Sequence, residues 1–180
     1  MVDVSEKDST KRTATATGHI YIPRIAYELV TGISSHSEHN TPVDKQRTKA
    51  SNKGDALTVA QLAAIMGCKR TSELIPLCHP VQLSNIAVTL TPEVVDAQDS
   101  QWQDSPSLRY RIRCTATISC EGKTGVEMEA LTAVSVGLLT VWDMLKAVAG
   151  REMAIGGIVV SHKSGGKSGE FTRCEVVEAA

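Results

Sequence analysis

The chain has 180 residues, of which 42% are hydrophobic and 22% are charged, with a formal net charge of −1 at pH 7. A chain of this length can bury a core without disulfides or metals, and we expect a single domain over residues 1–180. The near-neutral charge gives no general reason to expect nucleic acid or membrane partners. The sequence has no uninterrupted apolar run of about 20 residues, so we expect no membrane-spanning helix.

The first elements are predicted from alternation and capping signals. Residues 1–12 are polar and charged, which is typical of an arm. Small and apolar residues then alternate over 13–22, which predicts a strand. Pro23 opens a short helix that Gly32 closes.

A polar stretch separates this start from the first long helix. Residues 33–52 are almost wholly polar and predict a flexible loop, so its two histidines are expected to be solvated and not to bind a metal. Asp55 is a good N-cap for a helix over 56–68. A second short segment, 72–77, is stopped by prolines.

The second half of the chain predicts antiparallel strands around one buried helix. The run from Ala130 to Val141 has no charge and reads as a helix buried on most of its surface. An acidic surface loop is expected over 91–107. Strands are predicted over 85–90, 108–118, 155–161 and 171–177. Helices and strands without βα alternation favour an α+β fold.

The cysteines give no framework for disulfides or metals. They are odd in number and contain no CxxC pair: Cys68, Cys78, Cys114, Cys120 and Cys174. This pattern argues against a disulfide framework and a structural zinc site. We therefore expect buried free thiols and no metal site.

Charged groups stand at both ends of the buried helix. Glu127 and Glu129 precede it, and Asp143 and Lys146 follow it, three residues apart on one helix face. Such groups are costly to desolvate without partners and are candidates for a site. A surface ion pair between Asp143 and Lys146 is the alternative. Apolar neighbours favour a lysine with a lowered pKa that could act as a general acid or base.

Other segments carry groups suited to phosphate. Lys163 and Lys167 flank glycines whose backbone N–H groups could converge on an anion, although Ser161 stands where a Walker A loop requires glycine. Lys53 lies beside a helix N-terminus. His79 lies between two prolines. The alternative for the glycine-rich segment is a surface turn. For Lys53 it is a solvated lysine, and for His79 it is an exposed loop histidine.

These groups together suit proton transfers on a small polyanionic substrate. One alternative is a non-catalytic nucleotide-binding module, which would not explain the carboxylate of Asp143 near phosphate-binding groups. Another is an RNA-binding domain that uses Arg109, Arg111 and Arg113, but such sheets also need stacking aromatics.

The motifs in their order resemble the MoaC family of cyclic pyranopterin monophosphate synthases, which acts in molybdenum cofactor biosynthesis. The residues that carry this resemblance are MVDVSEK (1–7), KGD (53–55), LIPLCHP (74–80), TGVEMEALT (124–132), DMLKAV (143–148) and KSGGKSG (163–169). The resemblance covers nearly the whole chain. The loop 33–52 looks longer than in bacterial members.

The resemblance implies a fold, a reaction and an assembly. The fold would be ferredoxin-like, with an antiparallel sheet and helices packed on one face. The enzyme would be a phosphorus–oxygen lyase that converts 3′,8-cyclo-7,8-dihydro-GTP to cyclic pyranopterin monophosphate and releases pyrophosphate, without a cofactor. It would form a hexamer, a trimer of dimers, with active sites at dimer interfaces. We expect a cytoplasmic location, or the mitochondrial matrix if the chain is a domain of a eukaryotic protein.

The resemblance also implies roles for residues. Asp143 would be catalytic, together with Lys53 and Lys146 as acid–base or charge-stabilising groups. Lys163 would lie with the triphosphate. The substrate-binding residues would be Leu77, Cys78, His79, Glu127, Met128, Glu129, Lys163 and Lys167.

Overall fold

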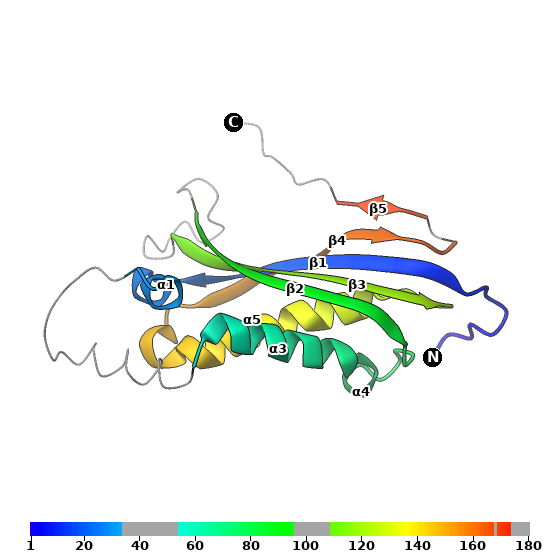
Figure 1. Ribbon diagram of the computed structural model, residues 1–180, viewed down its shortest axis with the longest axis horizontal. Coiled ribbons are helices and arrows are strands. Elements are labelled where there is room, and N and C mark those ends of the chain that lie inside the picture. Colours follow the sequence, from blue (N-terminus) through cyan, green and yellow to red (C-terminus); the bar gives the residue numbers. More distant parts are fainter. Residues whose placement is uncertain (34–53, 96–108, 168, 174–180) are drawn as a thin grey trace, which may run out of the picture.

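The computed structural model describes residues 1–33, 54–95, 109–167 and 169–173. It has the expected ferredoxin-like α+β fold, with an antiparallel sheet in the order β2-β3-β1-β4-β5 and helices beneath one face (Figure 1). The elements are β1 (Thr10–Ile22), α1 (Arg24–Thr31), α3 (Ala56–Lys69), α4 (Thr71–Leu74), β2 (Leu83–Val94), β3 (Tyr110–Gly122), α5 (Glu127–Ala149), β4 (Ala154–Ser164) and β5 (Phe171–Thr172).

The core lies between the central strands and α5. Side chains alternate along β1 and β3, so that one set is buried under the helices and the other set, rich in threonine, is half-buried on the opposite face. A Cβ at Gly18 would lie 2.8 Å from Cγ1 of Val134, so β1 and α5 approach closely at this point. This contact fixes α5 along the centre of the sheet.

The helix α5 is continuous over 23 residues. By length and composition it could cross a membrane. Val134, Leu138 and Val141 are fully buried in the core, however, and the core helix of a globular protein meets the same two criteria. The predicted buried helix is confirmed, and it extends beyond the apolar run at both ends.

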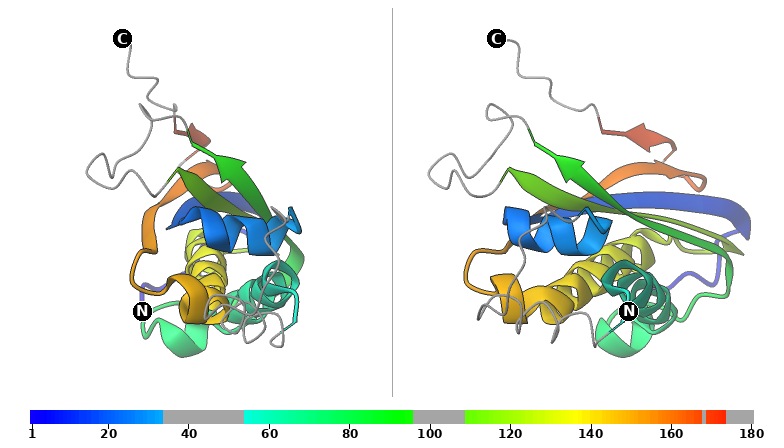
Figure 2. Two further views of the ribbon diagram at one scale, coloured as in Figure 1. Left: turned by 90° about the vertical axis from the view of Figure 1, so that its left-hand side faces the viewer. Right: turned by 60° about the vertical axis from the view of Figure 1, so that its left-hand side comes forward.

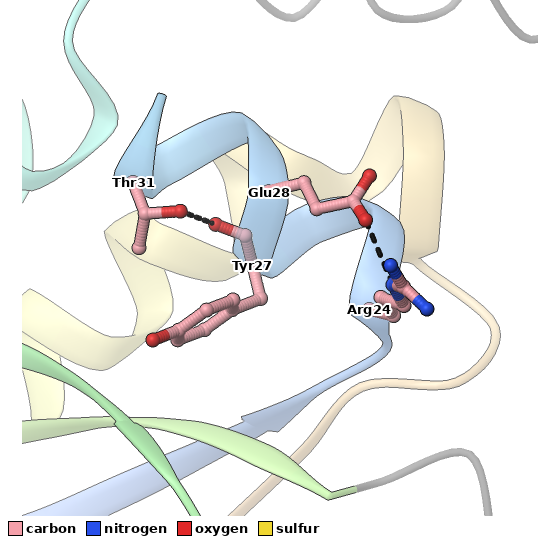
Figure 3. Close-up of polar contacts among 4 residues, drawn as sticks. All are labelled: Arg24, Tyr27, Glu28 and Thr31. Carbon is pink, nitrogen blue, oxygen red and sulfur yellow. Dashed lines mark hydrogen bonds and ion pairs between the residues drawn. The ribbon is translucent and has the colours of Figure 1, made fainter. Parts of the chain in front are cut away.

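The short helix α1 begins and ends as the sequence predicts. It starts after Pro23, and Gly32 ends it in the left-handed conformation with φ of 70°. Figure 3 shows its two polar contacts: Arg24 Nε donates to Glu28 Oε1 at 2.8 Å, and Thr31 Oγ1 donates to the Tyr27 carbonyl at 2.8 Å. The Arg24–Glu28 pair is an i, i+4 contact of the kind that stabilises a short helix modestly.

Several boundaries differ from those predicted. β1 begins at Thr10, inside the predicted arm, because Lys11 and Arg12 pair with Glu121 and Cys120 of β3 and thus join the sheet despite their charge. α4 covers only 71–74. Three predicted segments lie outside the described residues: the loop 33–52 apart from residue 33, most of the loop 91–107, and the end of the last predicted strand.

Three of the thiols are buried, as expected. Cys68, Cys114 and Cys120 are at most 1% exposed, and Cys78 is half-buried. Burial raises the pKa of Cys68 and of Cys114 to about 12, so these thiols are unreactive at neutral pH. Cys174 lies outside the described residues.

Gly67 sets the distance between α3 and α5 and provides a test of this packing. A Cβ there would lie 2.9 Å from Cβ of Val136, an atom that cannot move unless the helix moves. We expect Gly67→Ala to lower the free energy of unfolding by roughly 1–3 kcal/mol, measured by urea titration. Gly156→Ala is the matched control, since no described atom lies within 4 Å of its added Cβ. Equal stability of the two variants would contradict this account.

Candidate functional site

A cavity of about 310 Å³ opens at the N-terminal end of α5. It unites the predicted substrate-binding residues Leu77, Cys78, His79, Glu127, Met128 and Glu129. The N-terminal arm closes one side through Val2 and Val4, and the Lys123 ammonium holds the arm by donating to the Ser5 carbonyl at 2.6 Å. The arm is therefore part of the site.

A second cavity of about 260 Å³ adjoins the first and is strongly basic. The two share the lining residues Lys7, Thr124, Gly125 and Glu127. Four cationic side chains line the second cavity: Lys7, Arg12, Lys123 and Lys163. Such a concentration of positive charge suits a polyphosphate. Lys167 is exposed and is not among the lining residues.

Glu127 lies where the two cavities meet. Its Oε1 accepts from Lys163 Nζ at 3.2 Å. Its Oε2 occupies the space that a Cβ at Gly125 would need, so a side chain there would displace the Glu127 carboxylate. The N-cap residue of α5, Val126, gives the helix no side-chain hydrogen bond, and it lines the basic cavity.

Arg12 connects the two loops that form the basic cavity. Its Nε donates to the Gly122 carbonyl, at the end of β3, at 2.9 Å. Its Nη1 occupies the space that a Cβ at Gly166 would need, and Gly165 and Gly166 both have positive φ, at 90° and 78°. A side chain in the glycine-rich loop would therefore displace the guanidinium.

Sequence reasoning missed Lys7 and Arg12 as site residues. Lys7 already stands in the MVDVSEK motif, which was a usable signal. Arg12 gives no local signal, because its hydrogen-bond partner Gly122 is 110 residues away along the chain.

Glu129 is the most deeply buried carboxyl of the site, at 5% exposure. Burial raises its pKa, and the negative charge of Glu127 raises it further. Across the same cavity, burial and the charge of Glu129 raise the pKa of the Cys78 thiol. Glu129 therefore holds its proton to a higher pH than an ordinary glutamate does.

The predicted catalytic residues lie at the opposite end of α5. Lys146 Nζ contacts Asp143 Oδ1 at 2.5 Å, and both side chains are 57% exposed, so Lys146 is not held in an apolar environment within this chain. A third cavity, of about 370 Å³, borders this end and is lined by residues that include Gly54, Asp55 and Met144. Lys53 lies outside the described residues.

One chain therefore presents the predicted site residues as two separate groups. Glu129 and Asp143 are 14 residues apart on a continuous helix, or roughly 21 Å at about 1.5 Å per residue. A small substrate cannot contact both groups within one chain.

Known proteins resemble this chain over nearly its whole length. The MoaC family model matches residues 1–166. The chain is 42% identical over 173 residues to the cyclic pyranopterin monophosphate synthase of Campylobacter jejuni strain RM1221, covering 96% of this chain and 91% of that protein. It is 43% identical to the protein of the same name from Helicobacter hepaticus, covering 96% and 90%. The chain belongs to the MoaC family.

In this MoaC family member the arginine face of the sheet is not an open basic surface. Glu93 of β2 accepts from Arg111 Nε at 2.7 Å and forms an ion pair with Arg113, whose Nε lies 2.8 Å from Glu93 Oε1. Burial and the two arginines lower the pKa of the adjacent His19 to about 4, so this histidine is neutral at pH 7. The ion pairs therefore neutralise two of the three arginines on which an RNA-binding face would depend, and leave Arg109 exposed.

A metal site was not expected for this family member. Within the described ranges no group of three or more His, Cys, Asp or Glu side chains is arranged to hold a metal ion. The polar groups that line the two cavities are carboxyl, imidazole and cationic side chains.

The raised pKa of Glu129 makes stability depend on pH in a known direction. The folded state favours the protonated carboxyl. The protonated carboxyl therefore contributes fully to the free energy of unfolding below the ordinary glutamate pKa of 4.5, and this contribution is lost as pH rises through the raised pKa of the folded state. Glu129→Gln removes this titration. We therefore expect Tm of the variant, relative to wild type, to increase as pH rises from about 4.5 to 7.5. Glu121→Gln, at an exposed position on β3, is the control. If the Tm difference between Glu129→Gln and wild type does not change with pH, burial does not destabilise the Glu129 carboxylate.

Proposed function

We propose that this chain is a cyclic pyranopterin monophosphate synthase, a phosphorus–oxygen lyase. It would convert 3′,8-cyclo-7,8-dihydro-GTP to cyclic pyranopterin monophosphate and release pyrophosphate. The observation that carries the proposal is the basic cavity of Lys7, Arg12, Lys123 and Lys163 beside a cavity that holds a buried carboxyl. The printed names of the relatives support the same activity.

The two cavities divide the substrate between them. The triphosphate lies in the basic cavity, where Lys163 and Arg12 contact phosphate oxygens. The cyclised ring system lies in the first cavity, which has apolar walls from Val2 and Val4 and polar groups from His79 and Glu129. Glu127, at the junction, orients Lys163.

The phosphate step needs a base and a stabilised leaving group. A hydroxyl of the substrate loses its proton and its oxygen bonds to the α-phosphorus. The bond from that phosphorus to the oxygen of the β-phosphate breaks, and pyrophosphate leaves with the bonding electrons. Cations beside the leaving group lower the barrier by neutralising the charge that develops on it. The ring rearrangement needs proton transfers and no net oxidation.

Asp143, with Lys146 and Lys53, is the proposed catalytic group for these proton transfers. Because α5 separates Asp143 from the substrate cavities, the active site takes this group from a second subunit. The assembly we propose is a hexamer, a trimer of dimers, with the active sites at the dimer interfaces. The proposed compartment is the cytoplasm, or the mitochondrial matrix if the chain is a domain of a eukaryotic protein.

A non-catalytic nucleotide-binding module is the competing function. It would use the basic cavity equally well, but a carboxylate near a triphosphate opposes binding and has no purpose there. Turnover therefore separates the two functions.

Asp143→Asn tests the catalytic role. Wild-type protein should release pyrophosphate from 3′,8-cyclo-7,8-dihydro-GTP, whereas the variant should lose kcat by roughly 100-fold or more with little loss of substrate affinity. Phosphate release after pyrophosphatase treatment measures the rate. A variant with normal turnover would remove Asp143 from the mechanism, and a wild-type protein that binds without turnover would favour the binding module.

Pyrophosphate binding tests the basic cavity. Lys163→Ala and Arg12→Ala should each weaken pyrophosphate binding by roughly 10- to 100-fold, since each removes about one charge-assisted contact of 1.5–3 kcal/mol. Lys167→Ala should have a smaller effect because Lys167 is exposed. Lys11→Ala is the matched control, an exposed cation beside Arg12 that does not line the cavity. Calorimetric titration that gives wild-type affinity for both cavity variants would place the phosphates elsewhere.

A further inference from the structure

The N-terminal arm, residues 1–9, leaves β1 on the sheet and crosses to the helical layer. Its N-terminal end lies beside α4 (Figures 1 and 2). On this path the arm supplies Val2, Val4 and Lys7 to the lining of the first cavity, and the loop after α4 supplies residues 77–79. A ligand in the first cavity therefore lies against the arm.

A hydrogen-bonded turn joins the residues of the arm. Asp3 Oδ1 accepts from the Ser5 backbone N–H at 2.9 Å and from the Ser5 hydroxyl at 2.7 Å. The Lys7 backbone N–H donates to the Val4 carbonyl at 3.1 Å. Because these bonds all lie within the arm, a displacement of the arm carries Lys7 and Val4 together.

Few contacts hold the arm against the rest of the chain. Within the described residues, one hydrogen bond connects the two, from the Lys123 ammonium to the Ser5 carbonyl at 2.6 Å. Val4 is half-buried, and the rest of the arm is exposed. A segment with so little buried surface and one external hydrogen bond opens at a small cost in free energy.

Lys7 connects the arm to the basic cavity. Its side chain lines both cavities. The other three cations of the basic cavity, Arg12, Lys123 and Lys163, each contact a protein oxygen. Across the described ranges the Lys7 ammonium has no hydrogen bond or ion pair with another residue, which leaves its three N–H groups for a ligand. A phosphate group in the basic cavity suits this ammonium as a partner.

We propose that the arm is a strap that closes over the first cavity when a polyphosphate binds in the basic cavity, and that Lys7 couples the two events. With the arm closed, Lys7 contacts a phosphate oxygen, and with the arm open this contact is lost. A polyphosphate therefore binds the closed state more tightly and shifts the population toward it. Lys123 is the latch, because its ammonium lines the basic cavity and also holds the Ser5 carbonyl.

Closure of the strap has a consequence for the substrate. Binding of the triphosphate brings Val2 and Val4 over the ring system and excludes water from it while the rearrangement proceeds. This consequence rests on the proposed function. The coupling itself requires only that the basic cavity binds a polyphosphate, so inorganic pyrophosphate is a sufficient probe.

Cys78 reports the position of the strap in the wild-type protein. Its half-buried thiol lines the first cavity, whereas the thiols of Cys68, Cys114 and Cys120 are buried. The rate at which N-ethylmaleimide modifies Cys78, measured at fixed pH by mass spectrometry of its peptide, follows the fraction of open protein. We expect saturating pyrophosphate, established by calorimetric titration, to slow this modification by roughly 10-fold or more, the effect of one charge-assisted contact.

Two substitutions separate closure of the strap from simple occupancy of the basic cavity. Lys7→Met and Lys163→Met each remove one cation from that cavity, but only Lys7 lies on the arm. At saturating pyrophosphate, Cys78 should still be protected in the Lys163→Met protein and should react at the ligand-free rate in the Lys7→Met protein. Lys7→Arg, which keeps the charge, should restore protection. Equal protection in Lys7→Met and wild type would overturn the role of Lys7.

Removal of the latch gives a second test, without a ligand. Lys123→Met should speed the modification of Cys78 by roughly 3- to 10-fold, since one exposed hydrogen bond is lost. Arg173→Met is the matched control and should leave the rate unchanged, because Arg173 Nε donates to the Val160 carbonyl at 3.2 Å and its side chain lines neither cavity. A Lys123→Met protein with the wild-type rate would show that Lys123 does not hold the strap.

The outcomes distinguish the strap from the proposed function. Pyrophosphate that binds to the wild-type protein without protecting Cys78 would refute the strap and leave the proposed function intact. A wild-type protein that shows the protection but no turnover would refute the proposed function and support the strap. A protein that does not bind pyrophosphate at all would refute both.

Discussion

The rigidity of α5 is the constraint on which the rest of the structure depends. Its 23 residues form one uninterrupted helix, fixed along the sheet by the close approach at Gly18 and beside α3 by Gly67. A helix of this kind cannot bend to bring its two ends to one substrate. The chemical groups at its two ends are therefore kept apart within the chain.

The site combines two environments that have opposite electrostatic effects. The basic cavity concentrates cations where a polyphosphate can neutralise them, whereas the adjoining cavity withdraws a carboxyl from water. Glu127 separates the two by forming an ion pair with Lys163 at the boundary. The cations of the basic cavity come from the N-terminal arm, β1, the loop before α5 and β4, whereas the buried carboxyl comes from the first turn of α5.

Much of the fold followed from the sequence, and the failures have physical causes. The alternation in β1 and β3 and the caps of α1 and α3 are local signals, and the structure confirms them. The start of β1 was missed because Lys11 and Arg12 are charged, yet pairing with β3 gives their backbone groups partners. Residues 77–79 and 127–129 were predicted through motifs to bind substrate, and they line one cavity. Arg12 was missed because its role depends on loops that meet only in the folded chain.

The N-terminal arm has a consequence for anyone who prepares this protein. Val2 and Val4 form part of the cavity wall, and the Ser5 carbonyl is tied to Lys123. An affinity tag fused ahead of Met1 would join the chain beside the wall of this cavity, where its bulk and charge would compete with a ligand. Binding should therefore be measured both with such a tag and after its cleavage.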